Sequence, residues 1–219
     1  MGRHPSGCGG GIASGKLRLG IAPPFFPILA AGIVSAFQQQ YPETEIALFE
    51  GTEAEIASRL KEESLDAALA APQSGGELDS YLLFQDELCV LVRAGHPLLQ
   101  KATVTATDLS AEPLIVPMLG RSLAIAMLRG ANDGNGRPQI RHLVSDTPTI
   151  FALVRAGVGA ALLPRSAVPL DASDLSTAAL EPPFPITLAL LARSWAAASP
   201  AALRLRRTAE AWVQQHRSL

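Results

Sequence analysis

A serine in a glycine-containing turn is the residue with the clearest potential for chemistry. The segment from Gly120 to Ala124 reads GRSLA; it follows a short apolar run and precedes a helical pattern. Hydrolases place a nucleophilic serine in this context, but the second glycine of their motif is replaced here by Ala124. The candidate bases are His96, beside a proline, and His142, in the middle of an expected strand. We therefore expect Ser122 to cap a helix or contact a ligand, and we expect no enzymatic activity.

A second glycine motif, AGVGAALLP at residues 156–164, superficially resembles a dinucleotide-binding turn. Its glycines follow a helical pattern and precede a strand, which is the reverse of the order that dinucleotide binding requires. The motif instead predicts a glycine at a helix C-terminus followed by a buried strand. No histidine pair has metal-site spacing, and no phosphate-binding loop or glycosidase-like acidic pair is present. We expect neither a cofactor nor a metal site.

The composition indicates a globular chain that is not attracted to nucleic acid by its overall charge. Of 219 residues, 48% are hydrophobic and 17% charged, and the net charge is −2. The length suffices for one large domain or two small lobes.

The two cysteines and the N-terminal residues indicate the cellular compartment in which the chain is expected. Cys8 and Cys89 form no C-x-x-C motif, and Cys89 lies in an apolar run where a buried thiol is expected. This usage is typical of the reducing cytoplasm. No segment is long and apolar enough to span a bilayer. Residues 1–15 are Gly-rich and lack the apolar core of a signal peptide, so we expect a tag or linker remnant there.

Helical and strand patterns alternate along the chain. Thr52 and Glu55 predict a capping box at one helix start, and Pro148 is expected in the first turn of another. The expected strands are 16–21, 45–49, 65–70, 82–92, 113–117, 140–144, 159–163 and 186–191; the expected helices are 25–40, 52–63, 122–131, 147–156 and 199–213.

The βα pattern occurs twice, with breaks near residues 93 and 193. This order predicts an α/β fold of two Rossmann-like lobes joined by two crossing segments. Lobe I would comprise residues 16–92 plus 193–219, and lobe II residues 93–192. In such sheets ligands bind beyond the carboxyl ends of the strands, so a cleft between the lobes is the expected site.

Several short segments, taken in order, carry a family resemblance. They are GKLRLG at 15–20, LDAAL at 65–69, HPL at 96–98 and GVGAALLP at 157–164. Together they resemble the effector-binding domain of LysR-type transcriptional regulators, over nearly the whole chain from about Gly15. The resemblance implies a type 2 periplasmic-binding-protein-like fold and a ligand-sensing function.

The resemblance also implies the partners. A small-molecule effector would bind between the lobes and control DNA binding by an N-terminal helix-turn-helix that is absent from this chain. The domain would form homodimers by antiparallel pairing of lobe I with lobe II, with tetramers left open for the full-length protein. The alternative is a free-standing periplasmic-type solute-binding protein, against which the missing signal peptide argues.

The effector-binding positions implied by the family lie after the first strands and at helix starts. They are Ala22, Pro23, Pro24, Gly51, Thr52, Pro117, Met118, Gly120, Arg121, Ser122, Ser145, Asp146 and Thr147. Helix starts favour anions, and Pro23, Pro24, Pro117 and Met118 offer apolar walls, so we expect a partly apolar organic anion. Asp146 would instead repel an anion or select a cation.

Overall fold

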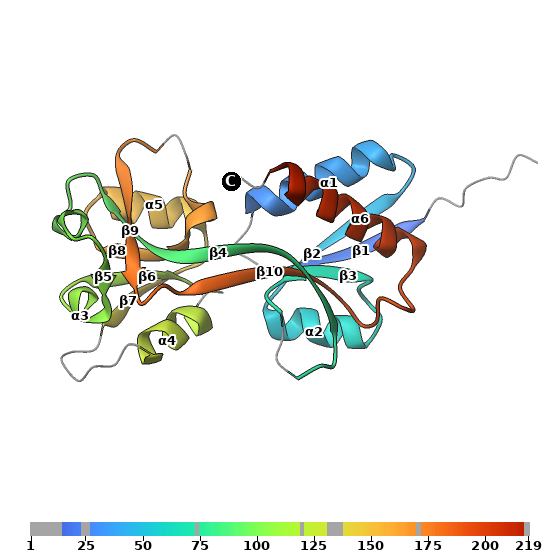
Figure 1. The fold of residues 1–219 in the computed structure, drawn as a ribbon, viewed down its shortest axis with the longest axis horizontal. Coiled ribbons are helices and arrows are strands. Elements are labelled where there is room, and N and C mark those ends of the chain that lie inside the picture. Colours follow the sequence, from blue (N-terminus) through green and yellow to red (C-terminus); the bar gives the residue numbers. More distant parts are fainter. Residues whose placement is uncertain are drawn as a thin grey trace, which may run out of the picture.

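Two long strands connect two groups of α/β elements. The computed structural model describes residues 15–22, 27–72, 75–118, 121–130, 138–169 and 172–216. Strands β4 (Asp79–Arg93) and β10 (Pro185–Ala192) pair antiparallel and run side by side from one group to the other (Figure 1). Strand β4 begins at Asp79 rather than at the expected Leu82.

The first group is a βαβαβ unit, as the alternating pattern predicted. Strand β1 lies between β2 and β3 and is parallel to both. The unit contains β1 (Lys16–Ile21), α1 (Pro27–Gln40), β2 (Glu45–Glu50), α2 (Glu53–Lys61) and β3 (Ala67–Ala70).

The second group repeats this arrangement. Strand β6 lies between β7 and β8 and is parallel to both. The unit contains β6 (Pro113–Pro117), α4 (Arg121–Gly130), β7 (Gln139–Val144), α5 (Thr147–Arg155) and β8 (Ala160–Pro164).

Strand β4 is shared between the two groups. Its first part, up to Glu87, pairs with β10, whereas its second part, from Leu88, pairs with β8 and β9 (Leu175–Glu181). The main path of strands is therefore β2-β1-β3-β10-β4-β8-β6-β7, with β2 and β7 at its two ends, and β9 pairs with β4 off this path.

The remaining elements complete the second group and the C-terminus. They are η1 (Pro97–Gln100), β5 (Val104–Thr105), α3 (Ala106–Leu109), η3 (Arg165–Ala167) and α6 (Pro200–Gln215). The sequence did not predict β9, because small residues such as Ser176 and Ala178 hide the alternation of its side chains.

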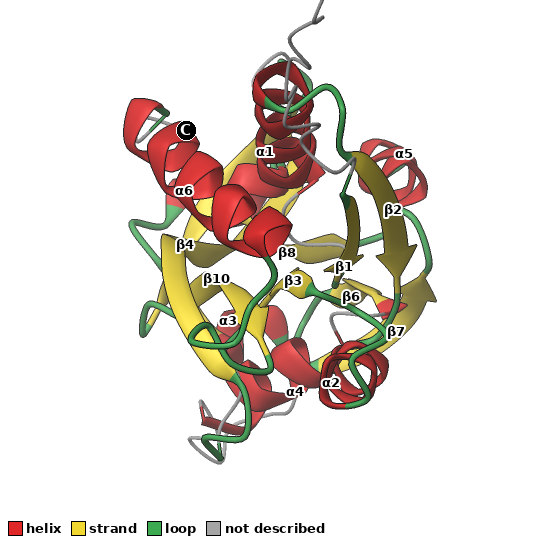
Figure 2. Ribbon diagram, turned by 90° about the vertical axis from the view of Figure 1, so that its right-hand side faces the viewer, coloured by secondary structure: helices red, strands yellow, loops and turns green. Residues whose placement is uncertain are grey.

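Helices cover both faces of each parallel unit. Helices α1 and α6 pack together over one face of β1 and β3, and α2 covers the opposite face (Figure 2). In the second group α4 and α5 likewise pack on opposite faces. On α6 the buried stripe includes Leu205 with Ala209 and Val213, whereas the expected Leu203 is only half-buried.

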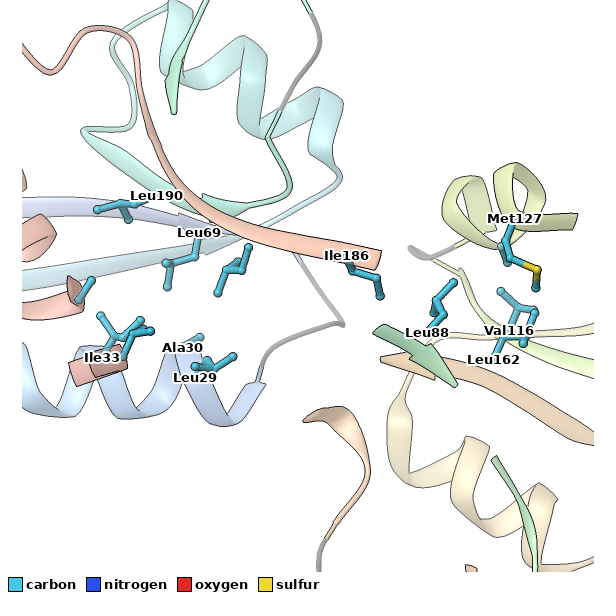
Figure 3. Packing of buried hydrophobic residues seen from close by; sticks show 14 of the residues in the cluster. Leu29, Ala30, Ile33, Leu69, Leu88, Val116, Met127, Leu162, Ile186 and Leu190 are labelled. Carbon is cyan, nitrogen blue, oxygen red and sulfur yellow. The ribbon is translucent and has the colours of Figure 1, made fainter. Parts of the chain in front are cut away.

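The largest hydrophobic cluster extends from one group into the other. Ile33 and Leu69 are buried in the first group, and Val116 and Leu162 in the second. Ile186 on β10 and Leu88 on β4 lie between them, so the crossing strands carry apolar packing across the junction (Figure 3).

Candidate functional site

A cleft of about 770 Å³ opens at the carboxyl ends of the parallel strands. From the first group it is lined by the ends of β1, β2 and β3 and by one face of α1; from the second group it is lined by the turn between β7 and α5. The lining residues are Ile21, Ala22, Ala30, Ala31, Val34, Ser35, Gln38, Leu48, Phe49, Glu50, Leu69, Leu188, Ser145, Asp146 and Thr147.

Backbone hydrogen bonds hold the strand ends that form the floor of the cleft. The amide of Ala22 donates to the carbonyl of Leu69 (2.9 Å), and the amide of Gly51 donates to the carbonyl of Ile21 (3.3 Å). Because these amides are already bonded inside the protein, the floor offers mainly apolar surface. Leu69 and Leu188 are buried beneath it.

Helix α1 supplies an uncharged wall. Residues 27–40 contain no acidic or basic side chain, and Ala30, Ala31 and Val34 line the cleft at helical spacing. Ser35 and Gln38, which lie further along the same helix, add hydrogen-bonding groups to the lining. A ligand with a hydrocarbon body is therefore suited to this side of the cleft.

The opposing wall is the start of α5. Asp146 is the N-cap, and its Oδ1 accepts a hydrogen bond from the amide of Thr149 (2.9 Å). This bond lowers the pKa of Asp146, which is therefore ionised at neutral pH. Pro148 occupies the first turn, as the sequence predicted.

The structure brings together four of the residues expected at the site: Ala22, Ser145, Asp146 and Thr147. Five others do not line this cleft, namely Gly51, Thr52, Pro117, Met118 and Arg121. Pro23, Pro24 and Gly120 lie outside the described residues, as does the side chain of Ser122.

Thr52 acts as a helix cap, as predicted. Its Oγ1 accepts a hydrogen bond from the amide of Glu55 (3.2 Å), and the Glu55 carboxylate accepts one from the amide of Thr52 (2.8 Å). The start of α2 therefore already holds a carboxylate of this chain.

Most of the residues that the first group contributes to the cleft were not predicted from the sequence. Glu50 could have been found, because it is the last residue of β2 and precedes the predicted Gly51. Leu188 and the face of α1 carried no such signal, since their sequence pattern is that of core residues.

The family follows from a match over most of the chain. The family model described as the LysR substrate binding domain matches residues 10–214. The chain belongs to this LysR family. The type 2 periplasmic-binding-protein-like fold expected from the resemblance is confirmed, and nothing supports the alternative of a free-standing solute-binding protein.

Relatives of the LysR domain are transcriptional regulators rather than enzymes. The transcriptional dual regulator GltC of Bacillus subtilis is 26% identical over 154 residues, covering 69% of this chain and 51% of GltC. The chain thus spans about half the length of the curated relatives it matches.

Solved structures share the fold of this LysR domain. The effector-binding domain of QuiR in complex with shikimate has a TM-score of 0.76 at 20% identity, covering 92% of this chain and 98% of that one. The oxidised form of OxyR has a TM-score of 0.71 at 24% identity, covering 92% and 95%.

The arrangement of the LysR domain argues against a catalytic serine. His96 lies near Pro113, at the start of β6, whereas Ser122 follows the end of β6. At about 3.3 Å per residue, this strand separates the two residues by more than 10 Å. His142 is exposed and pairs with Ile115 in the middle of the same strand.

The glycine motif of the LysR domain has the predicted structural role. Gly157 ends α5 with a φ of +72°, a conformation that favours glycine. A Cβ at Gly159 would lie 2.1 Å from the carbonyl oxygen of Pro113, so the glycine permits β8 to approach β6. The motif therefore ends a helix and lets two strands approach each other closely.

The described residues contain no cluster of three or more potential metal ligands. Among the helices that the structure describes, none has the length and apolar character needed to cross a membrane.

Proposed function

We propose that this LysR domain senses a partly apolar small molecule in the cleft and performs no chemistry on it. The regulator to which the domain belongs would act in the cytoplasm and contact DNA through a helix-turn-helix outside this chain. The observation that carries the proposal is the cleft itself, which is built from the carboxyl ends of one parallel unit and the β7–α5 turn of the other.

The proposed contact residues are those that share the cleft. Ala22, Leu69 and Leu188 would bury the hydrocarbon part of the effector, and Ser145, Asp146 and Thr147 would bind its polar part. The anionic effector expected from the sequence finds no basic residue among the lining residues that the structure describes. Contacts from Pro23, Pro24, Gly51, Thr52, Pro117, Met118, Gly120, Arg121 and Ser122 stay predictions.

The lobes predicted from the sequence are proposed as the units that move when an effector binds. Residues 16–92 plus 193–219 would form lobe I, and residues 93–192 lobe II. The pairing of β4 supports placing the first boundary earlier, between Glu87 and Leu88, where its partners change from β10 to β8 and β9.

The domain is proposed to form an antiparallel homodimer. The edge strands β2 and β7 end the sheet path, and each presents a leucine: Leu48 is 56% exposed and Leu143 is 41% exposed. A two-fold antiparallel pairing would bring β2 of one copy beside β7 of the other and cover Leu143.

The sensing proposal is tested by a thermal-shift screen of small organic molecules. A ligand present at 100 times its dissociation constant adds about 2.7 kcal/mol of stability, which such a screen detects. Thr147→Trp should fill the cleft and abolish the shift produced by each compound that binds there.

Ala152→Trp is the matched control, because Ala152 is exposed on the same helix and does not line the cleft. It should leave the shift unchanged. The proposal is wrong if the screen yields no binder, or if binding is indifferent to Thr147→Trp.

A further inference from the structure

The cleft contains a carboxylate at the end of β2 that no described residue neutralises. Leu48 and Glu50 are two residues apart on this strand, so their side chains lie on the same face of the strand. Both residues line the cleft. Glu50 is exposed and takes part in none of the ion pairs found among the described residues.

A second carboxylate, Asp146, faces the same space from the second group of elements. It is ionised at neutral pH, because the hydrogen bond from the amide of Thr149 lowers its pKa. Like Glu50, Asp146 has no ion-pair partner in the described part of the chain.

No positive group among the described lining residues offsets these charges. The described part of the lining contains the acidic residues Glu50 and Asp146 and no lysine, arginine or histidine. Helix α1, which forms the uncharged wall, contributes no basic residue at any of its positions. The described part of the cleft therefore carries a net negative charge beside a largely apolar surface.

Two of the helix starts that could attract an anion already hold acids of this chain. The start of α2 holds the carboxylate of Glu55, and the start of α5 holds that of Asp146. An incoming anion would meet the like charges of Glu50 and Asp146, which oppose its binding.

We propose that the effector of this cleft carries a positively charged head, a protonated amine attached to a hydrocarbon or aromatic body. This inference rests on the proposed sensing function and reverses the charge expected from the sequence. Glu50 and Asp146 bind the ammonium group from opposite walls, while Ala22, Leu69 and Leu188 contact the apolar body.

Two probes of similar shape and opposite charge test the assignment by titration calorimetry: 2-phenylethylammonium and 3-phenylpropanoate. The ammonium probe should bind and the carboxylate probe should not. Asp146→Asn and Glu50→Gln should each weaken binding of the ammonium probe roughly tenfold or more, as expected for loss of a charge-assisted hydrogen bond. Asparagine also caps helices well, so Asp146→Asn retains the start of α5.

Glu45→Gln is the matched control. Glu45 lies at the other end of β2, where it pairs with Lys16 on the surface (2.8 Å), so its loss removes the same charge without touching the cleft. Binding of the ammonium probe should be unchanged in this variant.

The inference is overturned if the carboxylate probe binds at least as tightly as the ammonium probe, if neither binds, or if the two cleft variants bind the amine as well as the parent. If the carboxylate probe binds to the parent and this binding is lost in Thr147→Trp, only the assignment of the effector's charge is overturned. The sensing function would then stand, because its own screen and variants do not depend on the sign of the charge.

Discussion

At the scale of single residues, Cys89 shows how burial determines chemistry. The thiol is fully buried in β4, and burial raises its pKa to about 12. At neutral pH the thiol is therefore almost entirely un-ionised, and the thiolate is the reactive form. Cys89 is therefore a packing residue, as the apolar run around it predicted, and it is unsuited to respond to oxidants.

We expect Cys89 to resist modification by a thiol reagent in the native protein. In a Cys8→Ser background it is the sole cysteine, so the reaction reports on it alone. Modification should be slow at neutral pH and should become fast when a denaturant exposes the strand. A native reaction rate close to that of a free cysteine peptide would show that β4 does not protect the thiol.

The sequence pattern predicted the helix N-caps correctly but missed most of the residues that line the cleft. Thr52, Asp146 and Ser199 bond to helix amides within three residues of themselves, so their roles are encoded locally. Glu50 and Leu188 reach the same cleft from strands far apart in the sequence. Their proximity depends on how β10 returns through the sheet, which no local pattern contains.

At the scale of elements, α1 and α6 pack closely because α1 has a glycine at the contact. A Cβ at Gly32 would lie 2.1 Å from Cζ2 of Trp212. The indole ring thus occupies the space that any side chain larger than glycine would need at position 32 of α1. The contact fixes the C-terminal helix against the first parallel unit.

Gly32→Ala should therefore destabilise the protein, although alanine favours a helix by about 1 kcal/mol over glycine. Overpacking against Trp212 should cost about 1–3 kcal/mol in the free energy of unfolding and outweigh or cancel that gain. Denaturant unfolding measures the effect. In a Trp212→Leu background the same substitution should be neutral or stabilising; an equal effect in both backgrounds would contradict the close contact.

The elements themselves were predictable where side chains alternate clearly. The two βαβαβ units follow from apolar strands and capped helices, and both were expected. Strand β9 was not, because its alanines and serine conceal the alternation and its pairing partner, β4, lies more than eighty residues earlier. Tertiary pairing rather than local preference makes this segment a strand.

At the scale of the whole molecule, the proposed dimer depends on the two edge strands. Leu143→Glu should place a charge in the interface and shift the protein to a monomer in sedimentation velocity experiments. Leu82→Glu is the control, because Leu82 is 60% exposed but lies on the central strand β4. A parent that sediments as a 23.0 kDa monomer at every concentration would refute the pairing.

The central claim is that an unaltered small molecule is held between the two groups of elements. A crystal structure of the domain with the tightest binder from the screen tests it most directly. The predicted result is density for the intact compound between the β7–α5 turn and the strand ends, in contact with Leu69, Leu188 and Asp146. Density for the compound elsewhere on the surface, or for a chemically changed product in the cleft, would contradict the account.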